Sequence, residues 1–177
     1  KEIIKKILAH DHPPRIGFCF GDGNPNDFAF CNAATLLNPL YDKYAEWGDY
    51  PELKEKAGGF SGEVRQDCFG NIYGRFDQKT KGECIYGILQ DGWDGLDNLT
   101  FPIINEEYDQ YVKQQKFAAC DKYVLATMHV AVFSSLRDCR HMDNALMDTA
   151  LEPENVTRFL GKIQELALEM VRRAAAN

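Results

Sequence analysis

The sequence predicts an α/β protein, because apolar strand-like runs alternate with amphipathic helical patterns. The clearest strand is residues 123–128, which are nearly all apolar and lack polar alternation. Such a run is typical of a parallel strand covered on both faces. The clearest helix follows Pro153, where apolar residues recur at i, i+3, i+4 and i+7. Buried strands separated by helices indicate an α/β architecture.

The amino-terminal part begins with a short amphipathic helix over residues 1–9, which Pro13 prevents from continuing. Residues 16–20 (Ile-Gly-Phe-Cys-Phe) predict a short buried strand. A dense loop signal of Gly, Asp, Asn and Pro follows at residues 21–27. The irregular pattern of residues 28–47 predicts short helices.

The central part changes to β-forming residues from about 60 to 90. The polar stretch at 77–82 separates two apolar runs and predicts a hairpin loop. Residues 91–97 predict a brief helical turn. Helices are expected at about 105–120 and 133–150, on either side of the apolar strand.

The chain has 177 residues, which is enough for one buried core, and it contains no Pro/Gly/Ser-rich linker. We therefore predict a single domain over residues 1–177. Two firm central strands are few, since a closed (β/α)8 barrel typically takes about 250 residues. The chain is then either a compact α/β domain or the first part of a barrel.

Composition excludes several classes of protein. A hydrophobic content of 45% excludes a disordered chain, and no apolar stretch approaches the roughly 20 residues of a membrane span. The net charge is −7 and the basic residues are scattered, which argues against nucleic acid or an anionic membrane as a partner. The amphipathic amino terminus does not resemble a secretory signal.

The six cysteines have no C-x-x-C spacing, which argues against a zinc ribbon or a redox motif. We interpret them as reduced thiols of a cytoplasmic protein.

Three segments, at 10–18 (HDHPPRIGF), 67–102 (beginning DCFGNIYGRF) and 133–163 (beginning FSSLRDCRHMDNALMDTALEP), carry motifs that resemble the uroporphyrinogen decarboxylase superfamily. The first, HDHPPRIGF at 10–18, is similar to the helix end and proline step before the family's first strand. The second, at 67–102, resembles a D-x-[WF]-G hairpin followed by an acidic segment and Phe-Pro. The third, at 133–163, resembles an aromatic residue followed by L-R-G-M-E, L-M-D-L-A-L-E-P and an amphipathic helix. The resemblance covers nearly all of this chain and about the first half of a family member.

This resemblance implies the amino-terminal half of a (β/α)8 TIM barrel with an inserted β-hairpin. The family's chemistries are porphyrinogen decarboxylation, which uses no cofactor, and methyl transfer between a corrinoid and a thiol such as coenzyme M, which uses zinc. The decarboxylase branch carries M-R-Q-A-G-R after its first strand, where this chain reads Phe-Cys-Phe-Gly-Asp-Gly-Asn at 18–24 and has no arginine. A polycarboxylate needs cationic partners. The chain is therefore more similar to the methyltransferase-like branch.

Under this interpretation the intact protein transfers a methyl group to or from a small-molecule methyl donor, with a corrinoid protein as a possible partner. This fragment alone is expected to be inactive. The zinc and the corrinoid belong to the intact protein, since the family's metal ligands lie in the later half, and no metal site is predicted in this chain. Two alternatives stay open: uroporphyrinogen decarboxylation of a tetrapyrrole-like ligand, and a non-enzymatic half-barrel that associates with itself or with a partner chain.

The loops after the carboxyl ends of barrel strands build the active site. Two strand ends are readable, and they predict Asp22 and His129 as catalytic residues at the rim. Phe20 and Asn24 beside the first end are predicted to contact substrate. The alternatives are an Asx-turn for Asp22 and a backbone hydrogen bond for His129.

The resembling segments add Asp67 and Phe133 as substrate-binding candidates, with a fold-signature role as the alternative for Asp67. Arg140 matches the family's arginine and is open to a structural ion pair. His141 stands where the family motif has glycine.

Overall fold

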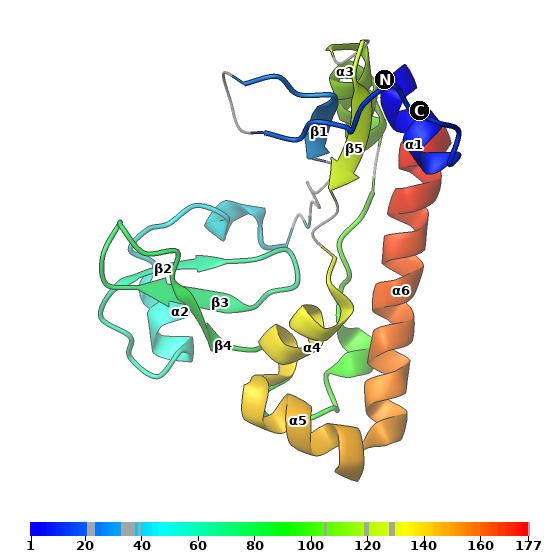
Figure 1. Ribbon diagram of the computed structural model, residues 1–177. Helices are drawn as coiled ribbons and strands as arrows, with labels where there is room; N and C mark the ends of the chain where they lie inside the picture. Colours follow the sequence, from blue (N-terminus) through cyan, green and yellow to red (C-terminus); the bar gives the residue numbers. More distant parts are fainter. Residues whose placement is uncertain are drawn as a thin grey trace. The chain divides into compact units, whose positions relative to one another are not determined.

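The computed structural model describes residues 1–20, 24–32, 38, 40–104, 106–118, 121–127 and 130–176 (Figure 1). Within these residues the protein is a mixed α/β structure with helices and two small sheets, and no closed barrel is formed. The chain divides into two compact units, and each is assembled from separate stretches. Unit 1 comprises Lys1–Thr35, Asn105–His129 and Met170–Asn177, and unit 2 comprises Leu36–Ile104 and Val130–Glu169. The single domain over residues 1–177 stays a prediction beside this division.

Unit 1 contains a two-stranded parallel sheet. Strand β1 (Phe28–Asn32) pairs with β5 (Tyr123–Thr127), in register from Phe28 opposite Tyr123 to Asn32 opposite Thr127. The predicted parallel strand near 123–128 is confirmed. Within the described residues one face of the pair is open, because Leu125 of β5 is 36% exposed and its partner Phe30 is 55% exposed, so the predicted cover on both faces stays a prediction.

The helices of unit 1 lie where the sequence predicts them. Helix α1 (Glu2–Leu8) and helix α3 (Glu106–Ala118) confirm the expected segments 1–9 and 105–120. Their buried residues, together with the end of helix α6 (Pro153–Ala176), form the interior of this unit: Ile4, Tyr108, Val112, Met170 and Ala174. The hydroxyl of Tyr108 donates a hydrogen bond to the carbonyl of Met170 at 3.2 Å, which ties α3 to the end of α6.

The first strand does not lie where the sequence predicts it. Residues 16–20 have no regular structure, and the strand is formed instead by residues 28–32, where short helices were expected. Asp27 explains the displacement, because its carboxylate accepts hydrogen bonds from the guanidinium of Arg15 at 2.7 and 2.8 Å and from the backbone N–H of Phe18 at 2.8 Å. These bonds hold residues 15–18 against the start of β1 as an irregular segment.

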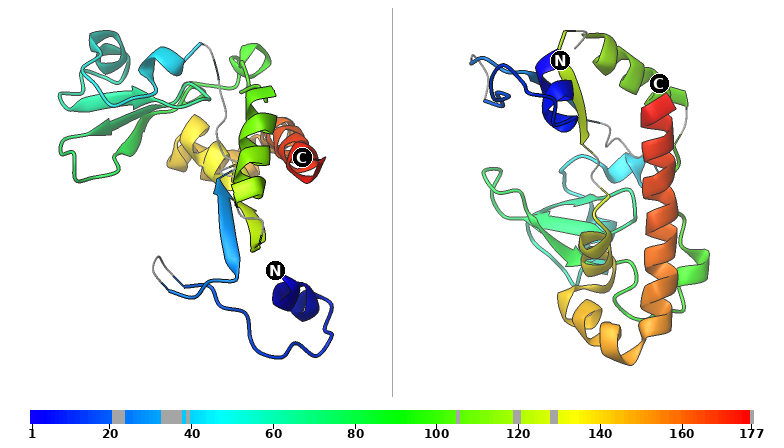
Figure 2. Two further views of the ribbon diagram at one scale, coloured as in Figure 1. Left: turned by 90° about the horizontal axis from the view of Figure 1, so that it is seen from above. Right: turned by 45° about the vertical axis from the view of Figure 1, so that its right-hand side comes forward.

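Unit 2 contains a three-stranded antiparallel sheet in the order β2–β3–β4. The strands are β2 (Glu63–Gln66), β3 (Ile72–Arg75) and β4 (Glu83–Tyr86). The predicted hairpin with its loop at 77–82 is confirmed, since β3 pairs antiparallel with β4. Helix α2 (Pro51–Lys56) lies beside the sheet (Figures 1 and 2) and buries Leu53 against Val64 and Ile72.

The second core of unit 2 is helical. Helices α4 (Val132–Arg140) and α5 (Met142–Leu151) follow one another alongside the first part of α6 (Figures 1 and 2). Short 3-10 helices at Asp42–Tyr44 and Leu96–Asn98 complete the unit, and the second overlaps the end of the helical turn predicted at 91–97. The interior gathers residues from both stretches of the unit: Phe69, Leu89, Leu96, Leu136, Cys139, Ala145, Val156, Phe159 and Ile163.

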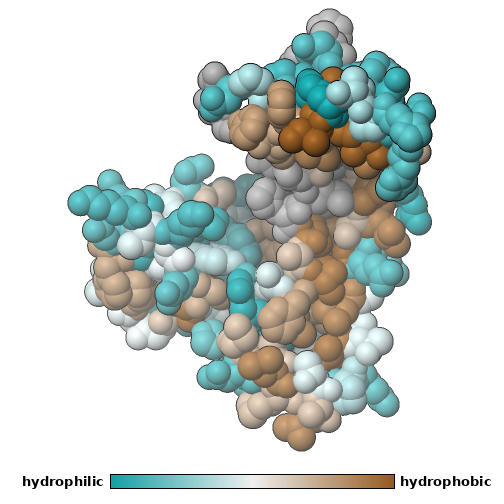
Figure 3. Space-filling model, in the orientation of Figure 1, coloured by the Kyte–Doolittle hydropathy of each residue, from teal (hydrophilic) through white to brown (hydrophobic). Residues whose placement is uncertain are grey.

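Surface polarity differs within unit 2. Hydrophilic residues gather over much of the three-stranded sheet and its loops, and hydrophobic residues gather over the region of α4 and α5 (Figure 3). Exposed apolar side chains of α5 include Met142, Leu146, Met147 and Leu151. Among the described residues, no helix combines the length and apolarity needed to cross a membrane.

Candidate functional site

Both predicted catalytic residues, Asp22 and His129, lie outside the described residues. Their catalytic roles stay predictions. The prediction that Phe20 and Asn24 lie after the carboxyl end of the first strand is wrong. The first strand is β1, which begins only at Phe28, so Phe20 and Asn24 precede its amino end. β5 runs parallel to β1 and ends at Thr127, so the carboxyl ends of the two strands lie together at the opposite edge of the pair.

Phe20 and Asn24 lie in the loop that leads into β1. Phe20 is half exposed, its ring centroid lies 5.6 Å from that of Phe18, and its carbonyl accepts a hydrogen bond from the Asn26 amide at 3.0 Å. The Asn26 side-chain oxygen in turn accepts from the backbone N–H of Phe28 at 2.9 Å. Asn24 is exposed. The loop is therefore organised by Asn26 and Asp27, and substrate contact by Phe20 and Asn24 stays a prediction.

Asp67 and Phe133 belong to unit 2, so the four substrate-binding candidates are divided between the units. Phe133 is 50% exposed in the first turn of α4. The Asp67 carboxylate is committed to its own turn. It accepts hydrogen bonds from the backbone N–H groups of Phe69 and Asn71, and from the Asn71 side chain, all at 2.9 Å.

These contacts explain the D-x-[WF]-G segment as a structural turn between β2 and β3. Burial raises the pKa of Asp67, and the hydrogen bonds from Asn71 and Phe69 oppose that shift. Asn71 extends the network. Its side-chain amide lies 3.4 Å from the Cys139 sulfur, and its oxygen accepts from the backbone N–H of Ile88 at 3.0 Å. The turn thus joins the sheet to α4.

Arg140 is a structural ion-paired residue, as one interpretation of the sequence had it. Its Nε donates to the Asp148 carboxylate at 2.7 Å, and both side chains are more than 90% buried. Nη1 donates to the carbonyls of Leu89 and Gln90, and the guanidinium carbon lies 4.8 Å from the ring centroid of Trp93. Arg140 and Asp148 come from the third resembling segment and Trp93 from the second, so these segments meet in one buried cluster.

The groups nearest to a reactive constellation lie where α4 meets β3 and β4. The Tyr73 hydroxyl donates to the Asp138 carboxylate at 2.9 Å, and the Cys84 thiol donates to the Asp138 carbonyl at 3.3 Å. The Arg137 Nε donates to the other carboxylate oxygen at 2.8 Å. A hollow of about 500 Å³ opens beside these groups, and Glu83, His141 and Met142 complete its polar and apolar lining.

The close approach of the segment after β4 to the end of α4 depends on Gly87. A Cβ at Gly87 would lie 2.5 Å from the backbone carbonyl oxygens of Asp138 and Cys139. Neither the Tyr73–Asp138 pair nor this contact follows from the local sequence, since the partners are more than 50 residues apart. One signal in the sequence could have identified this polar face of the sheet. Polar residues alternate with a period of two, with Arg65 in β2 and with Tyr73 and Arg75 in β3.

The thiols here are poor nucleophiles. Burial raises the pKa of Cys68 and of Cys84 to about 12, with the carboxylates of Asp67 and Asp138 adding to the shift. Burial likewise raises the pKa of Cys139 and of the Tyr73 phenol. Because thiolate is the form that attacks carbon or binds metal, these cysteines stay protonated and inert at neutral pH. The junction can bind a ligand through hydrogen bonds, but it presents no activated sulfur.

His141 has a strained backbone. It separates α4 from α5 with φ 65° and ψ 149°, a region that only glycine adopts readily. The Cβ of His141 therefore strains the backbone between the two helices. Its side chain is exposed and lines the hollow beside Tyr73.

The described residues do not form a zinc centre. Among them, no group of three or more histidine, cysteine, aspartate and glutamate side chains could hold a metal ion, and the thiols of the α4 junction are protonated. The zinc that the resemblance implies stays an expectation for the intact protein.

Comparison of the chain with protein-family models, with curated proteins and with solved structures gives no significant match. The resemblance therefore rests on the sequence motifs alone.

Proposed function

We propose that the intact protein transfers a methyl group between a small methyl donor, a corrinoid and a thiol, on a (β/α)8 barrel to which β1 and β5 belong. The observation that carries the barrel is their parallel pairing over five residues in register. Parallel strands occur almost only in larger sheets covered on both faces. The resembling segments supply the choice of chemistry.

The exposed apolar side chains of the β1–β5 pair favour a larger sheet in the intact protein. Phe30 and Leu125 stand opposite each other on one face, and they are 55% and 36% exposed. An isolated two-stranded sheet is at best marginally stable in water. Further strands and helices that cover these side chains would remove the apolar surface, as a barrel does.

Charge near β1 supports methyl transfer over decarboxylation. Arg15 is the one cationic side chain between residues 13 and 32, and its guanidinium is engaged by Asp27 in two hydrogen bonds. A tetrapyrrole with many carboxylates needs several available cations. This segment offers none, so it lacks the arginines that the decarboxylase branch carries after its first strand.

The protein encoded by the complete gene tests the chemistry. Methylcobalamin is offered with 2-mercaptoethanesulfonate, and the methyl thioether is measured by mass spectrometry. Uroporphyrinogen is offered in parallel, and its decarboxylated products are separated by chromatography. We expect thioether and no decarboxylation. Porphyrinogens with fewer carboxyl groups, or the absence of thioether, would contradict the proposal.

The same protein tests the barrel with two matched phenylalanines. Phe30→Asp should destabilise it by at least about 3 kcal/mol, because a covered aromatic would be replaced by a charge. Phe76→Asp is the control, since Phe76 lies on the hairpin and is 78% exposed. Equal, small effects of the two substitutions would show that nothing covers β1.

The exposed apolar pair also favours a second candidate, a half-barrel that associates through this face. Exposed contiguous apolar surface marks interaction sites. Size-exclusion chromatography should then show an oligomer that Phe30→Asp converts to a monomer. A monodisperse monomer before substitution would exclude this candidate.

Free thiols at Cys19, Cys68, Cys84 and Cys139 support the reducing cytoplasm as the compartment for either candidate.

A further inference from the structure

One face of the three-stranded sheet in unit 2 carries an unusual set of cations. Side chains alternate along strands, so Val64 and Ile72 are fully buried on one face. The other face bears Arg65, opposite Tyr73, and Arg75, opposite Glu63. Two arginines therefore project from neighbouring strands onto the same side, in a chain whose net charge is −7.

Trp47 orders both arginines. The guanidinium carbon of Arg75 lies 4.4 Å from an indole ring centroid, and that of Arg65 lies 5.2 Å away. Arg65 also lies 4.7 Å from the ring centroid of Tyr73. Gly82 allows the indole to approach, because a Cβ at this residue would lie 2.4 Å from the ring. Such cation–π contacts hold the guanidinium planes in place before any ligand arrives.

These residues surround a hollow of about 470 Å³. Its lining comprises Trp47, Arg65, Arg75, Thr80 and Lys81, with Ala45 and Glu46. Three of these side chains are cationic and one is acidic. The hollow thus concentrates positive charge on a protein that otherwise repels anions.

The partners of the cations differ. Arg75 is paired with Glu63 through an Nη2–carboxylate distance of 2.7 Å. Within the described part of the chain, Arg65 and Lys81 form no ion pair. Arg65 offers a planar set of N–H donors that matches phosphate or carboxylate oxygens, and Lys81 offers a flexible point charge.

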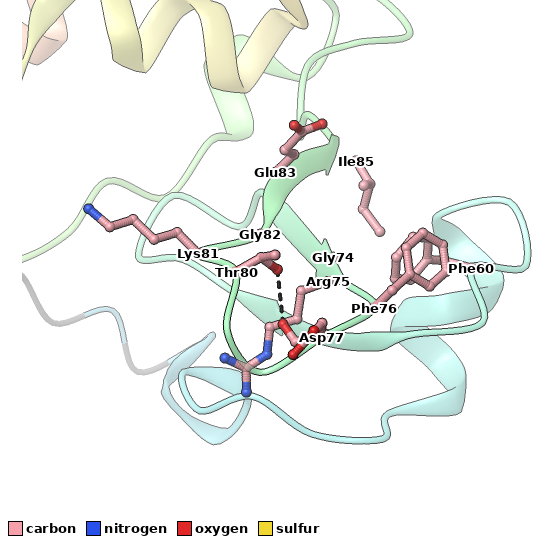
Figure 4. Close-up of a pocket in the computed structure, with 10 residues that line it drawn as sticks. All are labelled: Phe60, Gly74, Arg75, Phe76, Asp77, Thr80, Lys81, Gly82, Glu83 and Ile85. Atoms are coloured by element: carbon pink, nitrogen blue, oxygen red, sulfur yellow. Dashed lines mark hydrogen bonds between the residues drawn. The ribbon is translucent and has the colours of Figure 1, made fainter.

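A neighbouring hollow of about 440 Å³ shares Arg75, Thr80 and Lys81 (Figure 4). In that view Arg75 and Lys81 extend away from the aromatic pair Phe60 and Phe76. Arg75 and Lys81 line both hollows, and the guanidinium of Arg75 lies over the Trp47 ring.

We propose that the hollow around Trp47 binds a small oxyanion with two negative charges, as a phosphate or dicarboxylate group. Arg65 holds the anion through paired N–H donors and Lys81 supplies further positive charge, while Arg75 stays paired with Glu63 beside them. This site is independent of the methyl transfer proposed above, since it uses none of the residues of the parallel sheet.

Fluorescence of Trp47 tests the site directly. The protein has two tryptophans, and Trp93→Phe leaves Trp47 as the one indole emitter. The Trp93 Nε1 is buried without a partner in the described structure, so phenylalanine loses no hydrogen bond there. Inorganic phosphate and succinate are titrated separately at low ionic strength, with sodium chloride as the ionic-strength control.

We expect a saturable change in emission that chloride does not reproduce and that weakens at high salt. A response to phosphate alone assigns a phosphate group, a response to succinate alone assigns a dicarboxylate, and a response to both assigns the shared charge. Isothermal titration calorimetry on the unsubstituted protein should give the same affinities. The absence of saturable binding of either anion would overturn the proposal.

Charge-matched variants separate a built site from general attraction. Arg65→Gln should weaken binding at least tenfold and Lys81→Gln, which alters an exposed side chain, about threefold. Lys79→Gln removes the same charge from the same loop outside the hollow, so its effect should stay below twofold. Equal weakening by Lys81→Gln and Lys79→Gln would overturn the proposal even where Arg65→Gln fails to fold.

Discussion

The parallel pair of unit 1 and the three-stranded sheet of unit 2 have strands of similar length but different cover. In unit 2, Val64 and Ile72 are completely buried beneath α2. In unit 1, the paired Phe30 and Leu125 stay exposed. An apolar run thus indicates a strand without saying what covers it. Four substitutions or conditions test this comparison, from the largest expected effect to the smallest.

The largest effect is expected at the ion pair of unit 2. Arg140→Ala leaves the Asp148 carboxylate buried without its cation and removes one of the donors to each of the Leu89 and Gln90 carbonyls. The free energy of unfolding should fall by about 3–5 kcal/mol. Denaturant unfolding followed by tryptophan fluorescence measures this in unit 2 alone, because Trp47 and Trp93 both lie there.

Arg158→Ala is the control for this pair. Its partner Asp97 is 73% exposed and Arg158 itself 51% exposed, so the loss should stay below about 1 kcal/mol. Comparable losses for the buried and the exposed arginine would show that the cluster around Trp93 does not stabilise the fold.

Next is a pair of phenylalanines in this chain. Phe159→Ala empties a fully buried site in unit 2 and should cost about 3–4 kcal/mol. Phe30→Ala should cost less than about 1 kcal/mol, because the ring already contacts water. Thermal unfolding and hydrogen exchange measure the two effects. A large loss at Phe30 would mean that this face is covered in solution, by association for example.

A smaller effect depends on alkaline pH. The folded protein holds the pKa of Cys68 at about 12, above its ordinary value of 9. The contribution of the Cys68 thiol to the free energy of unfolding is therefore complete below pH 9. It is lost as the pH rises, because the thiol of the unfolded chain releases its proton while the buried thiol of the folded chain keeps it. At pH 10 the loss is at most about 1.4 kcal/mol.

Cys68→Ala should reduce this pH dependence between pH 8 and 10, as measured by urea unfolding at each pH. The remaining slope would come from Cys84, Cys139 and Tyr73, whose pKa values burial also raises. An unchanged slope in Cys68→Ala would show that this thiol is accessible to water.

The smallest effect is a gain at the junction of α4 and α5. His141→Gly removes the strain of its positive φ, and after the entropy cost of glycine the net stabilisation should be about 1 kcal/mol. His141→Ala is the control, because it keeps the Cβ and should give no gain. Equal melting temperatures for the glycine and alanine variants would contradict this prediction, because they would show that the imidazole of His141, and not its backbone strain, sets the change in stability.

Local chemistry decided which elements the sequence could predict. The hairpin was predictable because its loop at 77–82 is strongly polar, and Asp77 accepts a hydrogen bond from the Lys79 N–H within it. Helix α6 was predictable from its apolar period. Strand β1 was missed because Asp27 binds Arg15 and keeps the more apolar segment before it irregular.

Some contacts of the candidate site could also be predicted from the sequence, and others could not. The ion-paired role of Arg140 was open from the motif alone, and the packing of α5 supplied its partner Asp148. The Tyr73–Asp138 contact was out of reach, since it depends on how α4 docks onto the sheet. The cations around Trp47 lie on three separate segments, although the alternation in β2 and β3 already pointed to a polar face.

The interleaving of the two units bears on how the chain acquires its structure. Phe28 must find Tyr123 across the stretch Leu36–Ile104, which supplies the larger part of unit 2, and the core of unit 2 needs Phe69 and Phe159 together. Closing such long loops is entropically costly and slow. During synthesis neither unit can therefore be completed until the last helix has emerged, and the nascent strands must meanwhile be shielded from aggregation.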